Sequence, residues 1–228
     1  MEPAALTVYA SPFDKQRIGR EYDGGYVIVD IPNVTYSLLL AGGVETDITF
    51  EEDFVKKYGT KCIAFDGTIP CLPPTAVPME FVRKNIGHVN TPTLTNLHDI
   101  IDTHDNIFVK MDIEGGEIPW ITSLSSDQMN KFEQIVMEFH HPFSHAEGVV
   151  FNKLNEHHVL VHFHPNNCCG SRNHKGVLIP NIFECTYVHK KHFSSPPRLN
   201  TDTIPSVIDM KNVRSMNDIH ISHPPFVN

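Results

Sequence analysis

The chain has 228 residues, of which 40% are hydrophobic and 20% are charged, a composition typical of globular proteins. Its 27 acidic residues outnumber its 18 basic ones, so the formal net charge is −9. Nucleic-acid binding needs a basic surface, and we therefore expect neither DNA nor RNA as a partner. No apolar run reaches the roughly 18–20 residues that span a bilayer, and the start lacks a signal-peptide pattern. We expect a cytoplasmic protein with no membrane partner.

The length favours one large α/β domain with additions at both ends. We expect an N-terminal arm and cap over residues 1–34, a core over 35–192, and a mainly irregular tail over 193–228 that packs on the core. Five cysteines without C-x-x-C spacing predict reduced thiols, with neither a disulfide framework nor a cysteine zinc site.

The predicted core begins with an apolar strand over residues 35–41. A short β-branched strand over 26–29 precedes it and belongs to the arm. Gly42 and Gly43 close the core strand, and the apolar spacing over 48–58 predicts a helix. This succession of strand, glycine turn and helix is typical of the first unit of a parallel sheet.

Two further strands end in an acidic residue. Strands are predicted over 61–66, ending in Asp66, and over 106–112, ending in Asp112. Between them the sequence predicts a Pro-rich loop over 70–78, a helix start over 79–82, a strand near 85–89 and a helix over 94–101. After them it predicts a helix over 118–129, a strand over 134–140, and paired strands over 159–164 and 182–188.

These elements predict an α/β fold with a mostly parallel sheet, an antiparallel edge and helices on both faces. Ligands of such sheets bind outside the carboxyl ends of the strands. The Gly42–Gly43 pair, Asp66, Asp112 and Glu138 all lie at such ends and are expected to face one crevice.

The polar residues of this crevice favour a nucleoside cofactor without phosphate. Asp66, after the second core strand, is placed to hold ribose hydroxyls, although such an aspartate can also cap a helix. The segment after Gly43 lacks G-x-G-x-x-G and carries Glu45 and Asp47, which would repel a pyrophosphate. NAD and FAD are therefore disfavoured, and a positively charged cofactor is favoured.

The sequence resembles the FkbM-type family of class I S-adenosylmethionine-dependent methyltransferases. The resemblance rests on residues 36–51, 64–68 and 109–117, with supporting segments at 17–26, 162–167 and 179–184. It implies a Rossmann-like sheet, S-adenosylmethionine as cofactor, and O-methylation of a saccharide, a nucleotide-linked sugar or a glycosylated small molecule.

The resemblance also implies roles for individual residues. Gly42 and Gly43 would lie along the methionine part of the cofactor, with Glu45 or Asp47 near its ammonium group. Asp66 would hold the ribose, and the segment 93–99, which contains Asn96, would flank the adenine. The substrate would be contacted by Glu114, Glu117, His141, Asn166 and Asn167.

The candidate catalytic residues are Asp112, between cofactor and substrate, and His140 or His164 as the base that deprotonates a sugar hydroxyl. A divalent metal held by Asp112, Glu138 and His140 is the alternative. The metal-free base is favoured because the resemblance to FkbM-type enzymes implies no fixed metal-ligand motif. The segment 112–117 can also be a helix capping box, and His140 and His141 can be solvated loop residues.

Rival functions remain open at the level of sequence. A relative without catalytic activity could keep the crevice as a binding or scaffold module, and a methyltransferase could act on a protein or a lipid. A nucleotide-sugar enzyme using NAD is opposed by the missing G-x-G-x-x-G. The oligomeric state cannot be read from the sequence.

Overall fold

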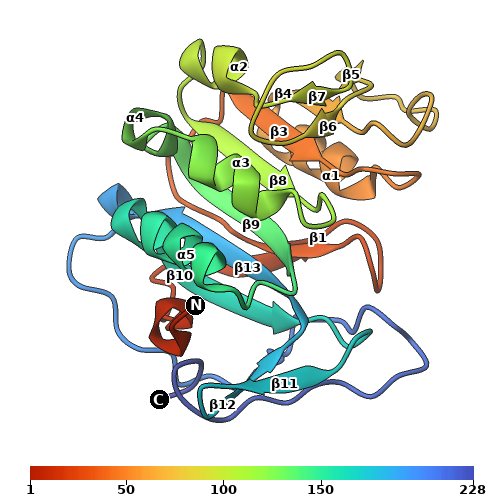
Figure 1. Ribbon diagram of the computed structural model, residues 1–228. Coiled ribbons are helices and arrows are strands. Elements are labelled where there is room, and N and C mark those ends of the chain that lie inside the picture. Colours follow the sequence, from red (N-terminus) through yellow and green to blue (C-terminus); the bar gives the residue numbers. More distant parts are fainter.

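The main feature of the fold is a seven-stranded sheet, seen in a computed structural model that describes all 228 residues except the side chains of 145–147 (Figure 1). In spatial order the strands are β10 (His158–Pro165), β13 (Ile182–His189), β9 (Phe132–His140), β8 (Ile107–Met111), β3 (Leu38–Gly42), β4 (Lys61–Phe65) and β5 (Met79–Val82).

The sheet is parallel from β9 through β8, β3 and β4 to β5. Strand β13 runs antiparallel to both of its neighbours, β9 and β10. The predicted mixed α/β architecture, with a mostly parallel sheet and antiparallel pairing at one side, is therefore confirmed.

The chain order creates a switch point between β3 and β8. From β3 the chain adds β4 and β5 on one side, then returns to add β8 and β9 on the other side. The connections leaving β3 and β8 therefore diverge, which opens a crevice at the carboxyl ends of these two strands.

Short helices and one long helix cover the first face of the sheet (Figure 1). Apolar side chains from these helices join Leu38, Val109 and Met137 of the sheet in the largest hydrophobic cluster. The covering elements are η1 (Pro3–Leu6), α2 (His98–Asp102), α3 (Glu117–Ser123), α4 (Ser126–Met129) and α5 (His145–His157).

The second face is covered by one helix and a hairpin. Helix α1 (Thr49–Tyr58) places Phe50 and Phe54, four residues apart, against Phe108 of β8, and Gly59 ends the helix with a left-handed φ of 63°. The hairpin of β1 (Lys15–Ile18) and β2 (Tyr26–Val29) lies across the same face toward β9 and β13. Helices thus lie on both faces, but only α1 on the second.

Three predicted elements were wrong. Of the helix expected over 94–101, residues 94–95 form strand β7 (Leu94–Thr95), which pairs with β6 (Asn85–Ile86), and the helix begins only at His98. Residues 79–82 form strand β5 instead of a helix start, because they pair in parallel with β4. The single helix expected over 118–129 is two helices, α3 and α4. The break occurs where Ser125 caps α4 by accepting a hydrogen bond from the Gln128 backbone N–H at 3.1 Å.

Three small elements complete the secondary structure. These are the pair β6 (Asn85–Ile86) and β7 (Leu94–Thr95), the hairpin β11 (Ser171–His174) and β12 (Val177–Pro180), and η2 (Lys190–His192). Among the described residues, no helix combines the length and the apolar character that crossing a membrane requires.

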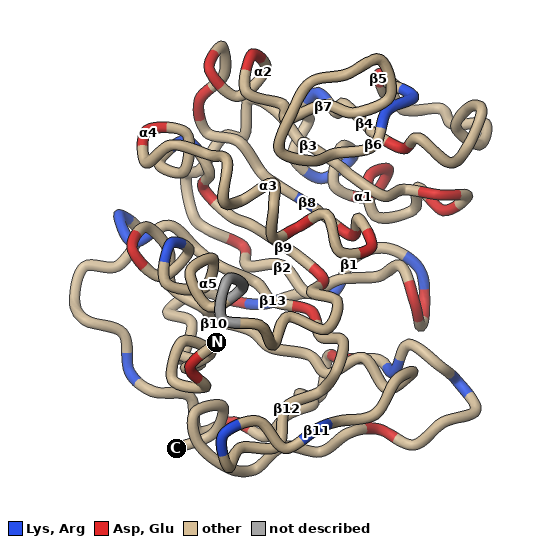
Figure 2. The backbone as a smooth tube through the Cα atoms, in the orientation of Figure 1, with Lys and Arg blue, Asp and Glu red and all other residues tan. Residues whose placement is uncertain are grey.

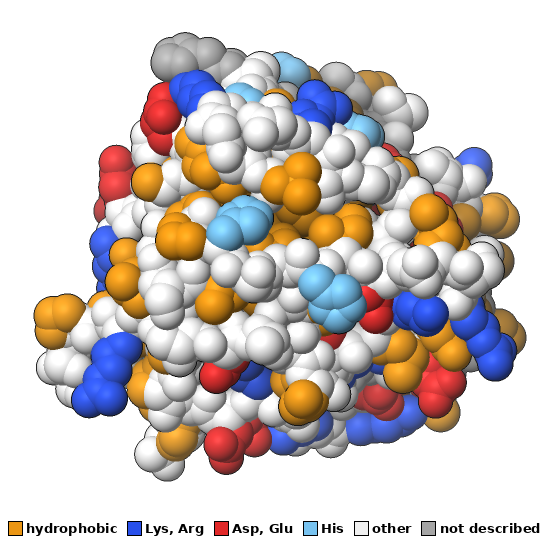
Figure 3. Space-filling view, turned by 90° about the horizontal axis from the view of Figure 1, so that it is seen from below, with side chains coloured by type: hydrophobic (Ala, Val, Ile, Leu, Met, Phe, Trp, Pro, Cys, Tyr) orange, Lys and Arg blue, Asp and Glu red, His pale blue; other side chains and the backbone are white. Residues whose placement is uncertain are grey.

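Residues 193–228 contain no helix or strand of their own, yet they belong to the folded body. Isolated bridges join Tyr9 to Leu199 and Ile204 to Ile221. Ile204, Ile221 and Phe226 are buried in the largest hydrophobic cluster. On the face seen in Figure 3, basic and acidic side chains are interspersed among hydrophobic ones.

Candidate functional site

Gly43 determines how closely β3 and β8 approach at their carboxyl ends. Its φ is +70°, and a Cβ at this position would lie 1.5 Å from the Asp112 carbonyl oxygen. The Asp112 backbone N–H donates to the Gly42 carbonyl at 3.1 Å, and Lys110 Nζ donates to the Gly43 carbonyl at 3.1 Å. Only glycine fits between these backbones.

Asp66, which follows β4, holds two loops in place. Its Oδ2 accepts from the Glu45 backbone N–H at 2.8 Å, and its Oδ1 accepts from the Thr68 backbone N–H at 2.7 Å and from the Thr68 hydroxyl. Burial alone would raise the pKa of Asp66, but these hydrogen bonds outweigh it and lower the pKa below its ordinary value. Asp66 is thus a structural acceptor as well as a ribose candidate.

Asp112 follows β8 and faces two protein groups. Its Oδ2 accepts from the Tyr26 hydroxyl at 2.8 Å, and its Oδ1 lies 3.8 Å from His140 Nε2. Asp112 Oδ1 is buried without a hydrogen-bond partner among the described residues. The predicted pairing of Asp112 with a histidine from the end of β9 therefore has a geometric basis.

His140 lies among three carboxylates. Its Nδ1 is 3.2 Å from Glu117 Oε1, and its Nε2 is 3.4 Å from Glu114 Oε2. Burial lowers the pKa of His140, but the hydrogen bond to Glu117 and the charges of the carboxylates outweigh burial and raise it. Acidic positions are concentrated along the loop from β8 to α3 (Figure 2).

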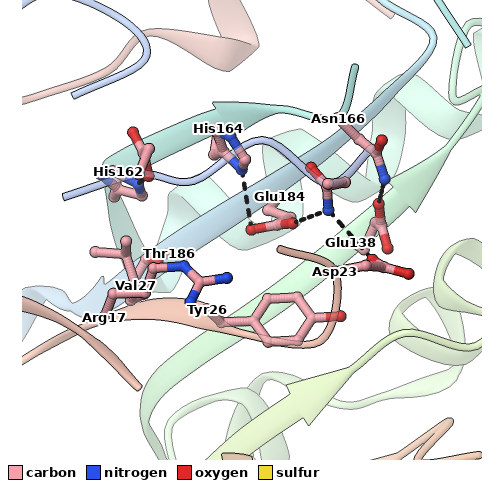
Figure 4. Close-up of polar contacts among 12 residues, drawn as sticks. Arg17, Asp23, Tyr26, Val27, Glu138, His162, His164, Asn166, Glu184 and Thr186 are labelled. Atoms are coloured by element: carbon pink, nitrogen blue, oxygen red, sulfur yellow. Dashed lines mark hydrogen bonds and ion pairs between the residues drawn. The ribbon is translucent and has the colours of Figure 1, made fainter. Parts of the chain in front are cut away.

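A row of polar side chains continues across the neighbouring strands at the same level (Figure 4). Glu138 of β9 is the cross-strand partner of Glu184 of β13, which in turn is the partner of His164 of β10. Glu184 Oε2 lies 3.3 Å from His164 Nδ1. This row lies on the face that the β1–β2 hairpin covers.

Two asparagine side chains donate hydrogen bonds to the glutamates of this row. Asn166 Nδ2 donates to Glu138 Oε1 at 2.7 Å, and Asn212 Nδ2 donates to Glu184 Oε1 at 2.8 Å. Burial, reinforced by the charges of Asp112 and Glu184, raises the pKa of Glu138 well above its ordinary value. Glu138 is therefore a buried acid that favours its neutral form.

The structure does not bring His164 to Asp112. His164 is 3% exposed and faces Glu184, whose charge and hydrogen bond raise the histidine pKa although burial lowers it. His162, two residues earlier, pairs with Asp209 of the tail at 2.8 Å. Of the two candidate bases, His140 alone lies beside Asp112.

Some of the residues expected to contact the substrate are exposed, and others are buried and bonded to other parts of the protein. Glu114 is exposed beside His140, whereas Glu117 is fully buried and accepts from the Ile113 backbone N–H at 3.0 Å, so it fixes the turn. The His141 side chain is exposed. Asn167 is buried and bonds the tail: its Nδ2 donates to the Val213 carbonyl at 3.0 Å.

Some of the residues expected to contact the cofactor lie at the crevice, and Asn96 does not. Glu45 and Asp47 both lie at the crevice, and Asp47 Oδ2 pairs with Arg20 Nε at 3.0 Å. Asn96 instead lies in the turn before α2: its Oδ1 accepts from the His98 backbone N–H at 3.2 Å, and its carbonyl accepts from Trp120 Nε1 at 3.0 Å. Asn96 lines neither cavity of the crevice.

Two small cavities form the crevice and share Gly43, Glu45 and Asp112. One, of about 110 Å³, lies toward β4 and β6 and is also lined by Asp66, Thr68, Asn85, Ile86, Phe65, Ile113 and Glu114. The other, of about 60 Å³, lies toward the hairpin and is also lined by Arg20, Asp23, Gly24, Tyr26, Val44, Asp47, Phe50, Glu51 and Lys110.

Three site residues were missed by sequence reasoning. Tyr26 contacts Asp112 from the hairpin, Lys110 lies 5.1 Å from the Tyr26 ring centre, and Glu184 pairs with His164. The signal for Lys110 and Glu184 was their position as charged residues within otherwise apolar strands, since a charged side chain in a buried strand needs a partner. Tyr26 stands in the segment 17–26 that supports the resemblance, but no role was predicted for its hydroxyl.

The expected metal ligands are only partly brought together. The atoms Asp112 Oδ1, Glu114 Oε2 and His140 Nε2 lie close to one another, and Glu114 takes the place predicted for Glu138. Glu138 instead accepts from Asn166 and does not belong to this group among the described residues, so the predicted set that includes Glu138 is not formed.

A larger cavity, of about 630 Å³, lies elsewhere. Its lining includes Tyr9, Asn155, His158, Lys190 and residues 193–197. His158 begins β10 and bonds the Phe132 carbonyl at the start of β9, so this cavity lies at the opposite end of the sheet from Asp112. Comparison of the chain with family models, curated proteins and solved structures found no match.

Proposed function

We propose that this protein is an S-adenosylmethionine-dependent O-methyltransferase with a Rossmann-like fold, acting on a saccharide, a nucleotide-linked sugar or a glycosylated small molecule. The observation that carries the proposal is the crevice at the β3–β8 switch point, where Gly43, Asp66 and Asp112 meet. The order β5–β4–β3–β8–β9 supports it, because it is the 3-2-1-4-5 order of doubly wound sheets, whose ligands bind at the topological switch point.

The acidic lining supports a cofactor that carries positive charge. Glu45 and Asp47 follow Gly43, where a phosphate-bearing cofactor would need free backbone N–H groups and no carboxylates. Asp66 Oδ2 accepts one hydrogen bond, and a carboxylate oxygen can accept two, so it can also receive a ribose hydroxyl.

The crevice must widen to admit the whole cofactor. Its cavities, of about 110 and 60 Å³, fall below the roughly 300–1,000 Å³ of typical ligand sites. Glu45 and Glu114 are exposed residues on the loops that border it, and their side chains are the ones that would have to move apart.

The pair of Asp112 and His140 supplies the proton acceptor. When bound, S-adenosylmethionine supplies a methyl group bonded to a sulfonium. Glu117 holds His140 Nδ1, which leaves Nε2 facing Asp112 and able to take the proton of an attacking hydroxyl. Tyr26 fixes the Asp112 carboxylate through its hydroxyl.

The test is transfer of a labelled methyl group from S-adenosylmethionine to a panel of free and nucleotide-linked sugars. Asp112→Asn keeps an oxygen for Tyr26 and should lower the rate by about 10²–10⁴-fold. Asp105→Asn makes the same change at an exposed position before β8 and should leave the rate unchanged. Cofactor binding without transfer to any sugar would favour a protein or lipid acceptor, or a binding module.

A further inference from the structure

We propose that Asp112, Glu114 and His140 form a binding site for one divalent cation, with Glu117 as the residue that positions the histidine. Asp112 and Glu114 lie on the loop that leaves β8, and His140 is the last residue of β9. The site therefore lies beside the crevice, at its border with the β9 end of the sheet.

The donor atoms are spaced as metal ligands are. His140 Nε2 is 3.4 Å from Glu114 Oε2 and 3.8 Å from Asp112 Oδ1, and all three donors lie within 4.8 Å of one another. Ligand distances of about 2.0–2.2 Å place neighbouring donors about 3–3.5 Å apart in octahedral or tetrahedral geometry. A single ion can reach all three donors after small side-chain shifts.

Glu117 gives His140 the second contact that metal-bound histidines almost always make. A proton on His140 Nδ1 is donated to Glu117 Oε1 at 3.2 Å, which leaves the Nε2 lone pair directed at the two carboxylates. Glu117 is itself fixed, because the same oxygen accepts from the Ile113 backbone N–H. The imidazole is thus oriented by a buried carboxylate from behind.

Buried acceptors without a hydrogen-bond partner favour a cation at this position. Asp112 Oδ1 and Glu117 Oε2 are buried without a hydrogen-bond partner among the described residues, and the Glu117 side chain is 1% exposed. Within the part of the chain whose side chains are described, no lysine or arginine forms an ion pair with Asp112, Glu114 or Glu117. Three carboxylates around one imidazole leave negative charge that a divalent ion would neutralise.

The donor set indicates the class of ion. The imidazole nitrogen favours a first-row transition ion over Ca²⁺ and Mg²⁺, which prefer oxygen donors alone, and the two carboxylate oxygens suit Mn²⁺ among the first-row ions. The Glu114 side chain is 77% exposed, so the outer side of the site is open to solvent. Water or a substrate hydroxyl would complete the coordination there, as in catalytic metal sites.

This site deepens the proposed function. If the protein is a methyltransferase, a cation here would lower the pKa of an acceptor hydroxyl beside Asp112, so that the hydroxyl could lose its proton to solvent and His140 Nε2 would serve as a ligand instead of as the base. The sequence alone favours the metal-free base. The cation site rests on the three donors and Glu117, and it stands whether or not methyl transfer is found.

The experiment is a titration of the full chain with Mn²⁺, followed by electron paramagnetic resonance of the free ion, without S-adenosylmethionine. We expect saturable binding of one ion per chain. Glu114→Gln changes an exposed residue and should weaken binding at least about tenfold, while Glu117→Gln should weaken it about 10–100-fold. Glu80→Gln, the same change at an exposed residue of β5, should leave affinity unchanged.

Pulsed resonance of the bound ion identifies the nitrogen ligand. Wild-type protein should show coupling of Mn²⁺ to one imidazole nitrogen, and His140→Gln should remove it. Absence of saturable binding, equal affinity in wild type and Glu114→Gln, or absence of nitrogen coupling would each overturn the site. Because no cofactor is present, these outcomes are independent of whether S-adenosylmethionine binds.

Discussion

Asp66 holds the local fold together and is also the residue proposed to bind the ribose. The sequence places it after β4, where both a cap and a ribose ligand are plausible. In the structure it joins the loop after β3, through Glu45, to the loop after β4, through Thr68. Any cofactor role is added to this structural one.

Asp66→Ala should therefore destabilise the protein even without a cofactor. The change leaves the backbone N–H groups of Glu45 and Thr68 without their acceptor, which should lower the free energy of unfolding by about 1–3 kcal/mol. Asp14→Ala, at an exposed side chain, is the control. Urea unfolding measures both, and equal stabilities would show that these bonds contribute nothing.

His158 predicts a pH dependence of stability. It is 1% exposed, and burial lowers its pKa to about 3, although its contact with the Phe132 carbonyl opposes the shift. Between about pH 6.5 and 3 the unfolded chain binds a proton that the folded chain does not, so stability should fall as the pH falls.

The loss should be about 2 kcal/mol between pH 7 and pH 5, since one pKa unit corresponds to about 1.4 kcal/mol. In urea unfolding, the free energy of unfolding of His158→Gln should fall less than that of wild type over this pH range, by the same amount. His88→Gln, at an exposed histidine, should retain the wild-type dependence. A His158→Gln profile identical to wild type would contradict the assignment.

For the catalytic candidates, the sequence predicts some neighbouring residues and not others. Asp112 and His140 were predictable as neighbours, because β8 and β9 are parallel and adjacent and end at one edge. His164 was not distinguishable, since alternation says that it faces one side of β10 but not that Glu184 meets it there. The resemblance implied that Asn167 contacts substrate. Its structural role was not predictable, because its partner Val213 lies 46 residues away in the tail.

At the scale of elements, the turn after β3 depends on glycine more than any other turn. Gly43→Ala would place a Cβ 1.5 Å from the Asp112 carbonyl in addition to a strained φ. Gly59, the C-cap of α1, has a similar φ of +63° but no atom within 4 Å of its Cβ position.

Gly59→Ala should therefore cost only the left-handed strain, about 1–2 kcal/mol. Gly43→Ala should cost clearly more, because β3 and β8 must separate at the crevice. Urea unfolding of both variants measures the difference. Equal losses would mean that the close approach of these strands is not needed for the fold.

The elements that sequence reasoning identified are the long buried strands and α1, whose apolar pattern decides the structure by itself. Strand β5 was not predicted, because its four partly exposed residues form a strand by pairing with β4 and show no strand-like hydrophobic pattern of their own. The division into helices α3 and α4 was not predicted, because the break at Ser125 lies within a continuous helical spacing of apolar residues.

At the scale of the whole molecule, the irregular tail is part of the core. Phe226 is fully buried, with its ring centre 4.6 Å from that of Phe163 on β10. The tail also supplies Asp209 to His162 and Asn212 to Glu184, so it closes the polar row of the sheet.

Phe226→Ala should lower the free energy of unfolding by about 3–5 kcal/mol, the usual cost of removing a buried aromatic ring. Val207→Ala lies in the same tail at a 99% exposed residue and should change it by less than about 0.5 kcal/mol. Thermal or urea unfolding compares the two. A small effect at Phe226 would mean that the tail is dispensable for the core.

The most direct test of the proposed function is a crystal structure of the protein with S-adenosylmethionine, because two parts of the molecule compete as ligand sites. We predict cofactor density at the carboxyl ends of β3 and β8, along Gly43 and with the ribose at Asp66. Density only in the 630 Å³ cavity at residues 193–197, or an empty crevice at saturating cofactor, would contradict the proposal.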